Sequence, residues 1–60
     1  MSKNFSLEES ILKDCRKNIS NFHNMSDVEI YEWMCDNFVC RDYELLRRCS
    51  FVIFKESRNS

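Results

Sequence analysis

The sixty-residue sequence contains no glycine and no proline. Without glycine, turns that need a positive φ are disfavoured, and without proline no position breaks a helix rigidly. Glycine-rich loops that cradle phosphate groups are excluded by the same absence. The composition therefore predicts a few helices joined by polar turns, and it favours surface binding over catalysis.

Long apolar runs are also missing. No stretch approaches the roughly 18 apolar residues that a membrane-spanning helix requires. The first residues, Met1-Ser2-Lys3-Asn4, lack the apolar segment of a signal peptide. We therefore expect a cytoplasmic protein. Histidine occurs only as His23, for which an exposed or capping role is expected rather than that of a general base.

The charges nearly cancel, since nine basic and ten acidic residues give a net charge of −1. This balance is typical neither of a basic protein that binds nucleic acid nor of an acidic protein that mimics DNA. A chain this short buries only about 60% of its unfolded surface, yet 43% of its residues are hydrophobic. We therefore expect a second copy or a partner protein to cover part of the apolar surface.

The four cysteines, at positions 15, 35, 40 and 49, include no C-x-x-C pair. In a cytoplasmic chain, reduced cysteines that pack as small hydrophobic residues are the favoured interpretation. A disulfide, or a zinc site that would add His23, is a weaker alternative. No cofactor is expected.

The first predicted helix begins at Ser6, because Ser6-Leu7-Glu8-Glu9 has the pattern of a capping box. Residues 1–5 before it are expected to be frayed. Apolar residues then recur at helical spacing up to Phe22. We expect this helix to fade at about residues 20–23, where asparagine accumulates.

A second capping box, Ser26-Asp27-Val28-Glu29, predicts a helix that starts at residue 26 or 27. Two models fit the residues after this start. One is a single helix over about 27–54 with two apolar faces, and the other has a break near Asp36-Asn37 before a third helix at about 40–53. The break is favoured, because asparagine is a weak helix former.

The apolar run 51–54 reads either as the last turn of that helix or as a strand paired between chains, and the helix is favoured. Residues 55–60 are expected to be a frayed polar tail. The sequence as a whole predicts an all-α fold in a single small domain over 1–60. That fold is a helical hairpin or a three-helix unit that self-associates.

No catalytic or metal site is predicted, so we expect a non-enzymatic protein that binds another protein as an inhibitor, adaptor or modulator. A phage or viral origin suits such a chain. The binding residues are expected among aromatic residues and Met, which are enriched in interface cores, with a rim of arginines. They are Tyr31, Trp33, Met34 and Phe38, with Arg41, Arg47 and Arg48 as the rim.

Short words of the sequence resemble the small NblA proteins. These words are Ser6-Leu7-Glu8, Asn24-Met25-Ser26, and Val39-x-Arg41-Asp42 followed by Glu44-Leu45-Leu46. The resemblance implies a helical hairpin that dimerises and acts as an adaptor delivering a target complex to a protease. The Ser-Asp-x-Glu start and the later Arg-Arg-Cys are similar to Hha-type nucleoid modulators. A nucleic-acid-associated regulator that uses the C-terminal arginines is the remaining alternative.

Overall fold

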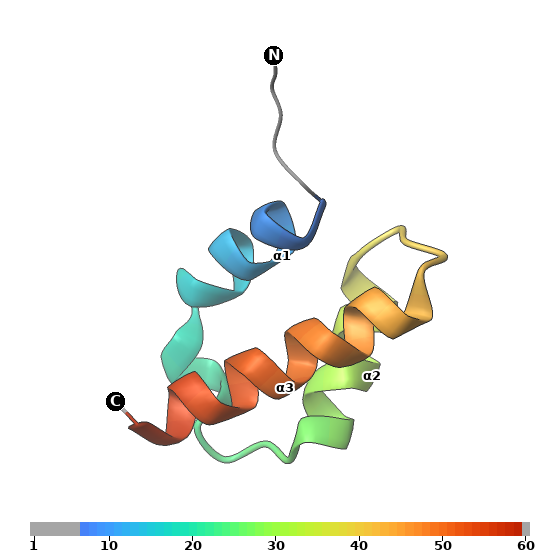
Figure 1. Ribbon diagram of the computed structural model, residues 1–60. Helices are drawn as coiled ribbons and strands as arrows, with labels where there is room; N and C mark the ends of the chain where they lie inside the picture. Colours follow the sequence, from blue (N-terminus) through green and yellow to red (C-terminus); the bar gives the residue numbers. More distant parts are fainter. Residues whose placement is uncertain (1–6, 60) are drawn as a thin grey trace.

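The computed structural model describes residues 7–59, which form three α-helices and one short 3-10 helix. The elements are α1 (Leu7–Arg16), η1 (Ile19–Phe22), α2 (Asp27–Asn37) and α3 (Tyr43–Asn59). The longest helix, α3, packs against α1, η1 and α2, and Figure 1 shows it crossing the molecule. There is no strand between residues 7 and 59. The predicted all-α fold is confirmed, in its three-helix form.

The start of α2 is fixed by its own side chains. Glu29 donates its backbone N–H to the Ser26 hydroxyl at 3.2 Å, and the Ser26 N–H donates to the Glu29 carboxylate at 2.9 Å. Both halves of the predicted capping box are therefore formed. Met25 packs against the core beside it, and Ile30 is fully buried.

The break between α2 and α3 is also confirmed, which excludes one long helix. Asn37 ends α2 and donates from its side chain to the Trp33 carbonyl at 2.8 Å. Phe38 is extended, with φ −118° and ψ 134°. Asp42 then accepts the Leu45 N–H at 3.1 Å and so caps the start of α3. This carboxylate, which interrupts the apolar pattern of the sequence, marks where the third helix begins.

The first helix is shorter than predicted. It ends at Arg16, and Asn18 leaves the helical region with φ −124° and ψ 34°. The chain continues as η1, which carries Phe22 into the core, where it is 1% exposed. The turn at Asn18 allows this burial, because a continuous helix would place Phe22 further along the axis of α1. Residues 1–5 and the predicted cap Ser6 lie outside the described residues.

The apolar run 51–54 is helical, as favoured, but it does not end the helix. Residues 55–59 continue α3 to Asn59. The prediction of a frayed polar tail from residue 55 is therefore wrong over 55–59. Ser57 is even fully buried and donates to the Phe54 carbonyl at 2.8 Å.

Contacts that are distant in sequence hold this last part of α3. The Arg16 guanidinium meets the Glu56 carboxylate through two bonds of 2.9 and 2.7 Å, linking α1 to α3. This ion pair raises the pKa of Arg16 and lowers that of Glu56. At the helix end, Arg58 donates to the Met25 carbonyl at 3.0 Å. The ring nitrogen Nδ1 of His23 lies 3.2 Å from another carbonyl of α3.

Each of the four helical elements contributes residues to the hydrophobic core. Among residues 7–59, the buried hydrophobic residues of the core are Ile11, Leu12, Cys15, Phe22, Ile30, Met34, Leu46, Cys49 and Ile53. Burial raises the pKa of the Cys15 thiol to about 12 and that of Cys49 to about 11, so both stay protonated at neutral pH. These two cysteines therefore pack as small hydrophobic residues.

The other two cysteines, Cys35 and Cys40, are half-buried, and all four are free thiols. Across residues 7–59, no three metal-binding side chains gather into a group that could hold an ion. In the same part of the chain, no helix combines the length and the apolar character needed to cross a membrane.

Candidate protein-binding face

The structure divides the predicted binding cluster between the core and the surface. Met34 is fully buried in the chain's own core. Trp33 is half-buried and stacks edge-to-face on Phe22, with ring centroids 5.1 Å apart, and on Phe38 at 5.9 Å. These rings pack on one another and on the core. The structure thus gives Trp33, Met34 and Phe38 packing roles inside the chain.

Tyr31 lies on another side of α2, next to α3. The Arg47 guanidinium sits over its ring, 5.3 Å from the centroid. Desolvation and a hydrogen bond with the Cys35 thiol raise the pKa of Tyr31. The cation–π contact joins the middle of α2 to the first half of α3 at the surface. Two of the predicted site residues, Tyr31 and Arg47, are therefore brought together.

Two helical stripes meet at this contact. Val28, Tyr31 and Cys35 follow spacings of three and four residues on α2, and so occupy one side of that helix. A second stripe on α3 has the same spacings of three and four residues. It consists of Tyr43, Arg47, Phe51, Phe54 and Arg58. We call these eight residues the α2–α3 face.

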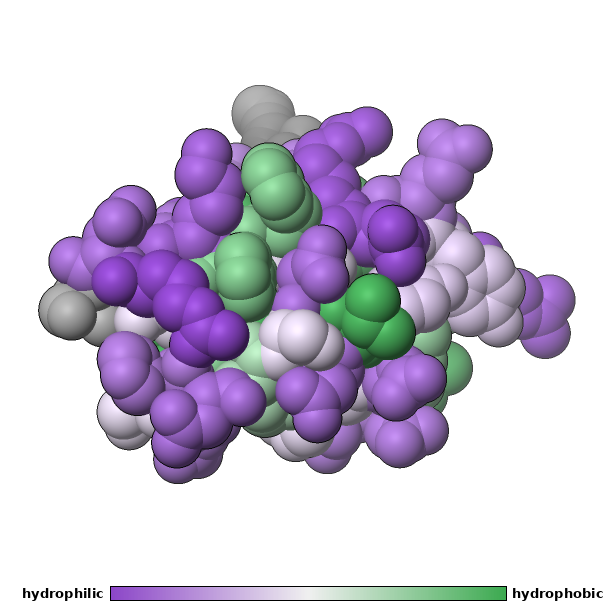
Figure 2. All heavy atoms as spheres, turned by 90° about the horizontal axis from the view of Figure 1, so that it is seen from below, coloured by the Kyte–Doolittle hydropathy of each residue, from purple (hydrophilic) through white to green (hydrophobic). Residues whose placement is uncertain are grey.

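Apolar side chains on the α2–α3 face are unusually open to solvent. Val28 is 49% exposed, Tyr43 58% and Phe51 53%. Figure 2, which looks at the molecule from below, shows exposed apolar side chains with strongly hydrophilic ones between them. Sequence reasoning missed Val28, Tyr43 and Phe51. The signal that could have found Tyr43 and Phe51 is their spacing of four residues on either side of Arg47, which places all three on one side of a helix.

The cations of this face lie against aromatic rings. Arg58 lies over Phe54 at 4.7 Å, just as Arg47 lies over Tyr31, and Lys55 at its edge lies over Phe51 at 5.3 Å. No carboxylate of residues 7–59 forms an ion pair with Arg47 or Arg58. A guanidinium that stacks on a ring still presents its N–H groups at the ring's edge. The face therefore offers apolar contact and charged donors together.

The remaining predicted arginines do not share this face. Arg41 belongs to the loop 38–42, and Arg48 is turned about 100° around α3 from Arg47. The three arginines of the predicted rim therefore lie on three different parts of the surface. The same loop carries Val39, whose side chain is fully exposed and lies outside both stripes.

Charge is separated between the two helices. α2 contains Asp27, Glu29, Glu32 and Asp36 and no lysine or arginine. α3 contains four cations, and of its two carboxylates Glu56 is already paired with α1. Neighbouring helices of one small protein thus carry opposite charge.

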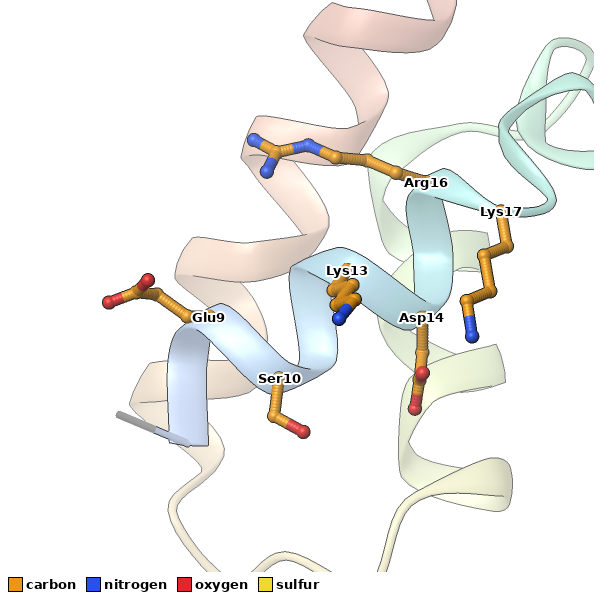
Figure 3. A pocket seen from close by; sticks show the side chains of 6 residues that line it. All are labelled: Glu9, Ser10, Lys13, Asp14, Arg16 and Lys17. Atoms are coloured by element: carbon orange, nitrogen blue, oxygen red, sulfur yellow. The ribbon is translucent and has the colours of Figure 1, made fainter. Parts of the chain in front are cut away.

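A second surface feature is an open depression along the outside of α1. Polar side chains from this helix and its end line it: Glu9, Ser10, Lys13, Asp14, Arg16 and Lys17. Figure 3 shows these side chains pointing in different directions, with no common point on which they converge. The depression therefore lacks the arrangement of a catalytic or ligand-binding site.

Comparison with protein-family models, with curated proteins and with solved structures finds no match to this chain.

Proposed function

We propose that the protein is a non-enzymatic binding module that docks on another protein through the α2–α3 face. It would act as an inhibitor, adaptor or modulator of that protein. The observation that carries the proposal is the combination of half-exposed Val28, Tyr43 and Phe51 with two arginines that lack a carboxylate partner among residues 7–59. Exposed apolar side chains grouped on one side of a small protein indicate an interaction surface.

The chemistry of the face specifies the partner surface. Apolar groups would cover the exposed rings of Phe51 and Tyr43. Carboxylates would pair with Arg47 and with those N–H groups of Arg58 that do not donate to the Met25 carbonyl. Aromatic residues and arginine are the types that contribute most to binding when they are desolvated at the centre of an interface. The expected partner surface is therefore an apolar patch with acidic residues around it.

A nucleic-acid partner is the alternative that the cations of α3 support. Arg47, Arg48, Lys55 and Arg58 are spread over about 16 Å of helix. The four carboxylates of α2 lie on the helix packed beside them and oppose a phosphate backbone. The protein partner is favoured for that reason. An NblA-like adaptor role, a phage or viral origin and a cytoplasmic location stay predictions.

The test is affinity capture from a lysate of the organism that makes the protein, with and without nuclease. Phe51→Ser removes the most central exposed ring of the face, and Val39→Ser is the matched control on an exposed apolar residue outside it. We expect wild type and Val39→Ser to retain the same protein after nuclease treatment, and Phe51→Ser to lose at least nine-tenths of it.

Two results would overturn the proposal. One is equal retention by Phe51→Ser and wild type. The other is retention that disappears with nuclease and falls steeply with salt, because that behaviour belongs to phosphate binding.

A further inference from the structure

The α2–α3 face combines exposed rings with arginines, and none of its eight residues is a carboxylate. We propose that its occupant is an acidic amphipathic helix of another protein, which lies along α3 with its apolar side chains on Tyr43 and Phe51. This inference rests on the proposed function, since it assumes that the face docks on protein, and it specifies the charge and the secondary structure of the partner segment.

Charge complementarity is the argument for an acidic occupant. The stripe on α3 carries Arg47 and Arg58, and Lys55 lies at its edge. Of the two carboxylates of α3, Glu56 is bound to α1, so that Glu44 is the one left beside these cations. Carboxylates that approach from a partner therefore meet an excess of positive charge, which favours both the encounter and the correct register.

The same charges disfavour a second copy of this chain as the occupant. A two-fold axis along the seam between α2 and α3 would bring Arg47 and Arg58 beside their own counterparts. The eight residues of the face supply no carboxylate to place between them. The charge of the face is therefore matched by a different, acidic chain.

Most acidic residues of α2 lie away from the path of such a helix. Around α2, Glu29, Glu32 and Asp36 are turned by about 160°, 100° and 140° from Tyr31, toward the outer side. Asp27 shares the side of Tyr31 but stands at the first position of the helix. An amphipathic helix can place its carboxylates over α3 alone, whereas a phosphate backbone carries charge along its whole length.

The backbone of the face favours a helical occupant over an extended one. α2 and α3 bond their backbone N–H and C=O groups within the helices, and residues 7–59 contain no strand to which an extended segment could be added. An extended segment would therefore bury backbone polar groups without partners on this face. A helix satisfies these groups internally.

The length of the stripe specifies the length of the partner helix. Tyr43 and Phe51 are about 12 Å apart along the axis of α3, with Arg47 halfway between them, and Arg58 lies about 10 Å further on. A helix of about 15 residues covers this distance of about 22 Å. α1 does not obstruct it, because Glu56, which binds α1, lies about 180° around α3 from Arg47.

Designed peptides test the inference on the full chain. The probe is a fluorescent peptide of about 16 residues, half leucine and half glutamate, with the leucines at the spacing of one helix face. A second peptide has lysine in place of every glutamate. A third has the same composition as the first but alternates leucine and glutamate, which is the pattern of a strand. Fluorescence anisotropy should show that the first peptide binds wild type at least tenfold more tightly than the others.

Variants test whether the peptide binds at the α2–α3 face. Phe51→Ser and Arg47→Glu should each weaken binding of the acidic helical peptide at least tenfold, with circular dichroism spectra like that of wild type. Arg47→Glu should also bind the lysine peptide more tightly than wild type does. Val39→Ser and Arg41→Glu are matched controls in the loop 38–42, outside the face, and should bind the acidic peptide like wild type.

Lys55→Glu repeats the charge reversal at the edge of the face, without touching the contact between Arg47 and Tyr31. We expect it to weaken binding of the acidic peptide at least threefold. This variant keeps the charge test decisive if Arg47→Glu unfolds the chain.

Four results would overturn the inference. In the first, the lysine peptide or the alternating peptide binds wild type as tightly as the acidic helical peptide. In the second, Phe51→Ser and the charge reversals leave binding unchanged. In the third, the chain alone sediments as a dimer that Phe51→Ser dissociates, because a second copy then covers the face. In the fourth, a DNA oligonucleotide binds the face more tightly than the acidic peptide.

The outcomes separate this inference from the proposed function. If Phe51→Ser loses a captured protein but wild type does not prefer the acidic helical peptide, docking at the face stands and the acidic helix is wrong. If Phe51→Ser changes neither capture nor peptide binding, both proposals are wrong.

Discussion

Tyr31 and Trp33 stand two positions apart on α2, and both are half-buried, but they lie on different sides of the helix. Two residues turn a helix by about 200°, so their side chains leave it in nearly opposite directions. Tyr31 meets Arg47 on the α2–α3 face, whereas Trp33 packs on Phe22 and Phe38. A group of aromatic residues in the sequence therefore predicts an interface only in part, because the side of the helix decides which of them reach the surface.

Trp33→Ala should accordingly act on stability. We expect the free energy of unfolding to fall by about 2–3 kcal/mol, since the ring is half-buried and loses contact with Phe22 and Phe38. Urea unfolding followed by circular dichroism measures the change. Trp33→Phe, which keeps an aromatic ring, is the control and should lose less than half as much. A fully stable Trp33→Ala variant that no longer binds its partner would instead support Trp33 as a contact residue.

At the level of helices, the boundaries that depend on nearby residues were predictable, and the end of α3 was not. The start of α2 follows from Ser26 and Glu29, which lie three residues apart, and the break before α3 follows from Asn37. The end of α3 depends on partners far away in sequence. Arg16 and Glu56 are forty positions apart, and Met25 and Arg58 are thirty-three apart. The sequence pattern of residues 55–59 is only polar, and it therefore predicts a frayed tail.

A chain that ends after Phe54 tests the role of this last segment. It loses the ion pair of Arg16 and the bond from Arg58 to Met25. The ion pair is about half exposed and is worth at most about 1 kcal/mol, and a hydrogen bond contributes a similar amount. We expect a total loss of about 2–3 kcal/mol once the packing of Ser57 is included.

Thermal unfolding of this shortened chain, beside a control chain that ends at Arg58, measures the loss. The control keeps all three contacts and should unfold close to wild type. If the chain ending at Phe54 were as stable as the control, residues 55–58 would be a dispensable tail after all.

For the whole molecule, the net charge of −1 hides a strong separation of charge. The acidic residues of α2 and the cations of α3 cancel in the total, so composition described the chain as neutral. Their placement on adjacent helices is a consequence of the three-helix fold, since α2 and α3 are each other's main neighbours. The same fold groups Val28, Tyr43 and Phe51 on one surface. The grouping of these three residues is not visible until the ends of the helices and their sides are known.

Photo-crosslinking in cells tests the central claim, that the α2–α3 face contacts another protein chain. A photoreactive phenylalanine analogue is placed at position 51 in one variant and at position 39 in the other, since both positions are exposed in the free chain. We predict abundant adducts from position 51 and few from position 39. An adduct of twice the chain's mass identifies a second copy, and any other mass identifies a different partner. Equal labelling from the two positions, or adducts from position 39 alone, would contradict the assignment of the binding face.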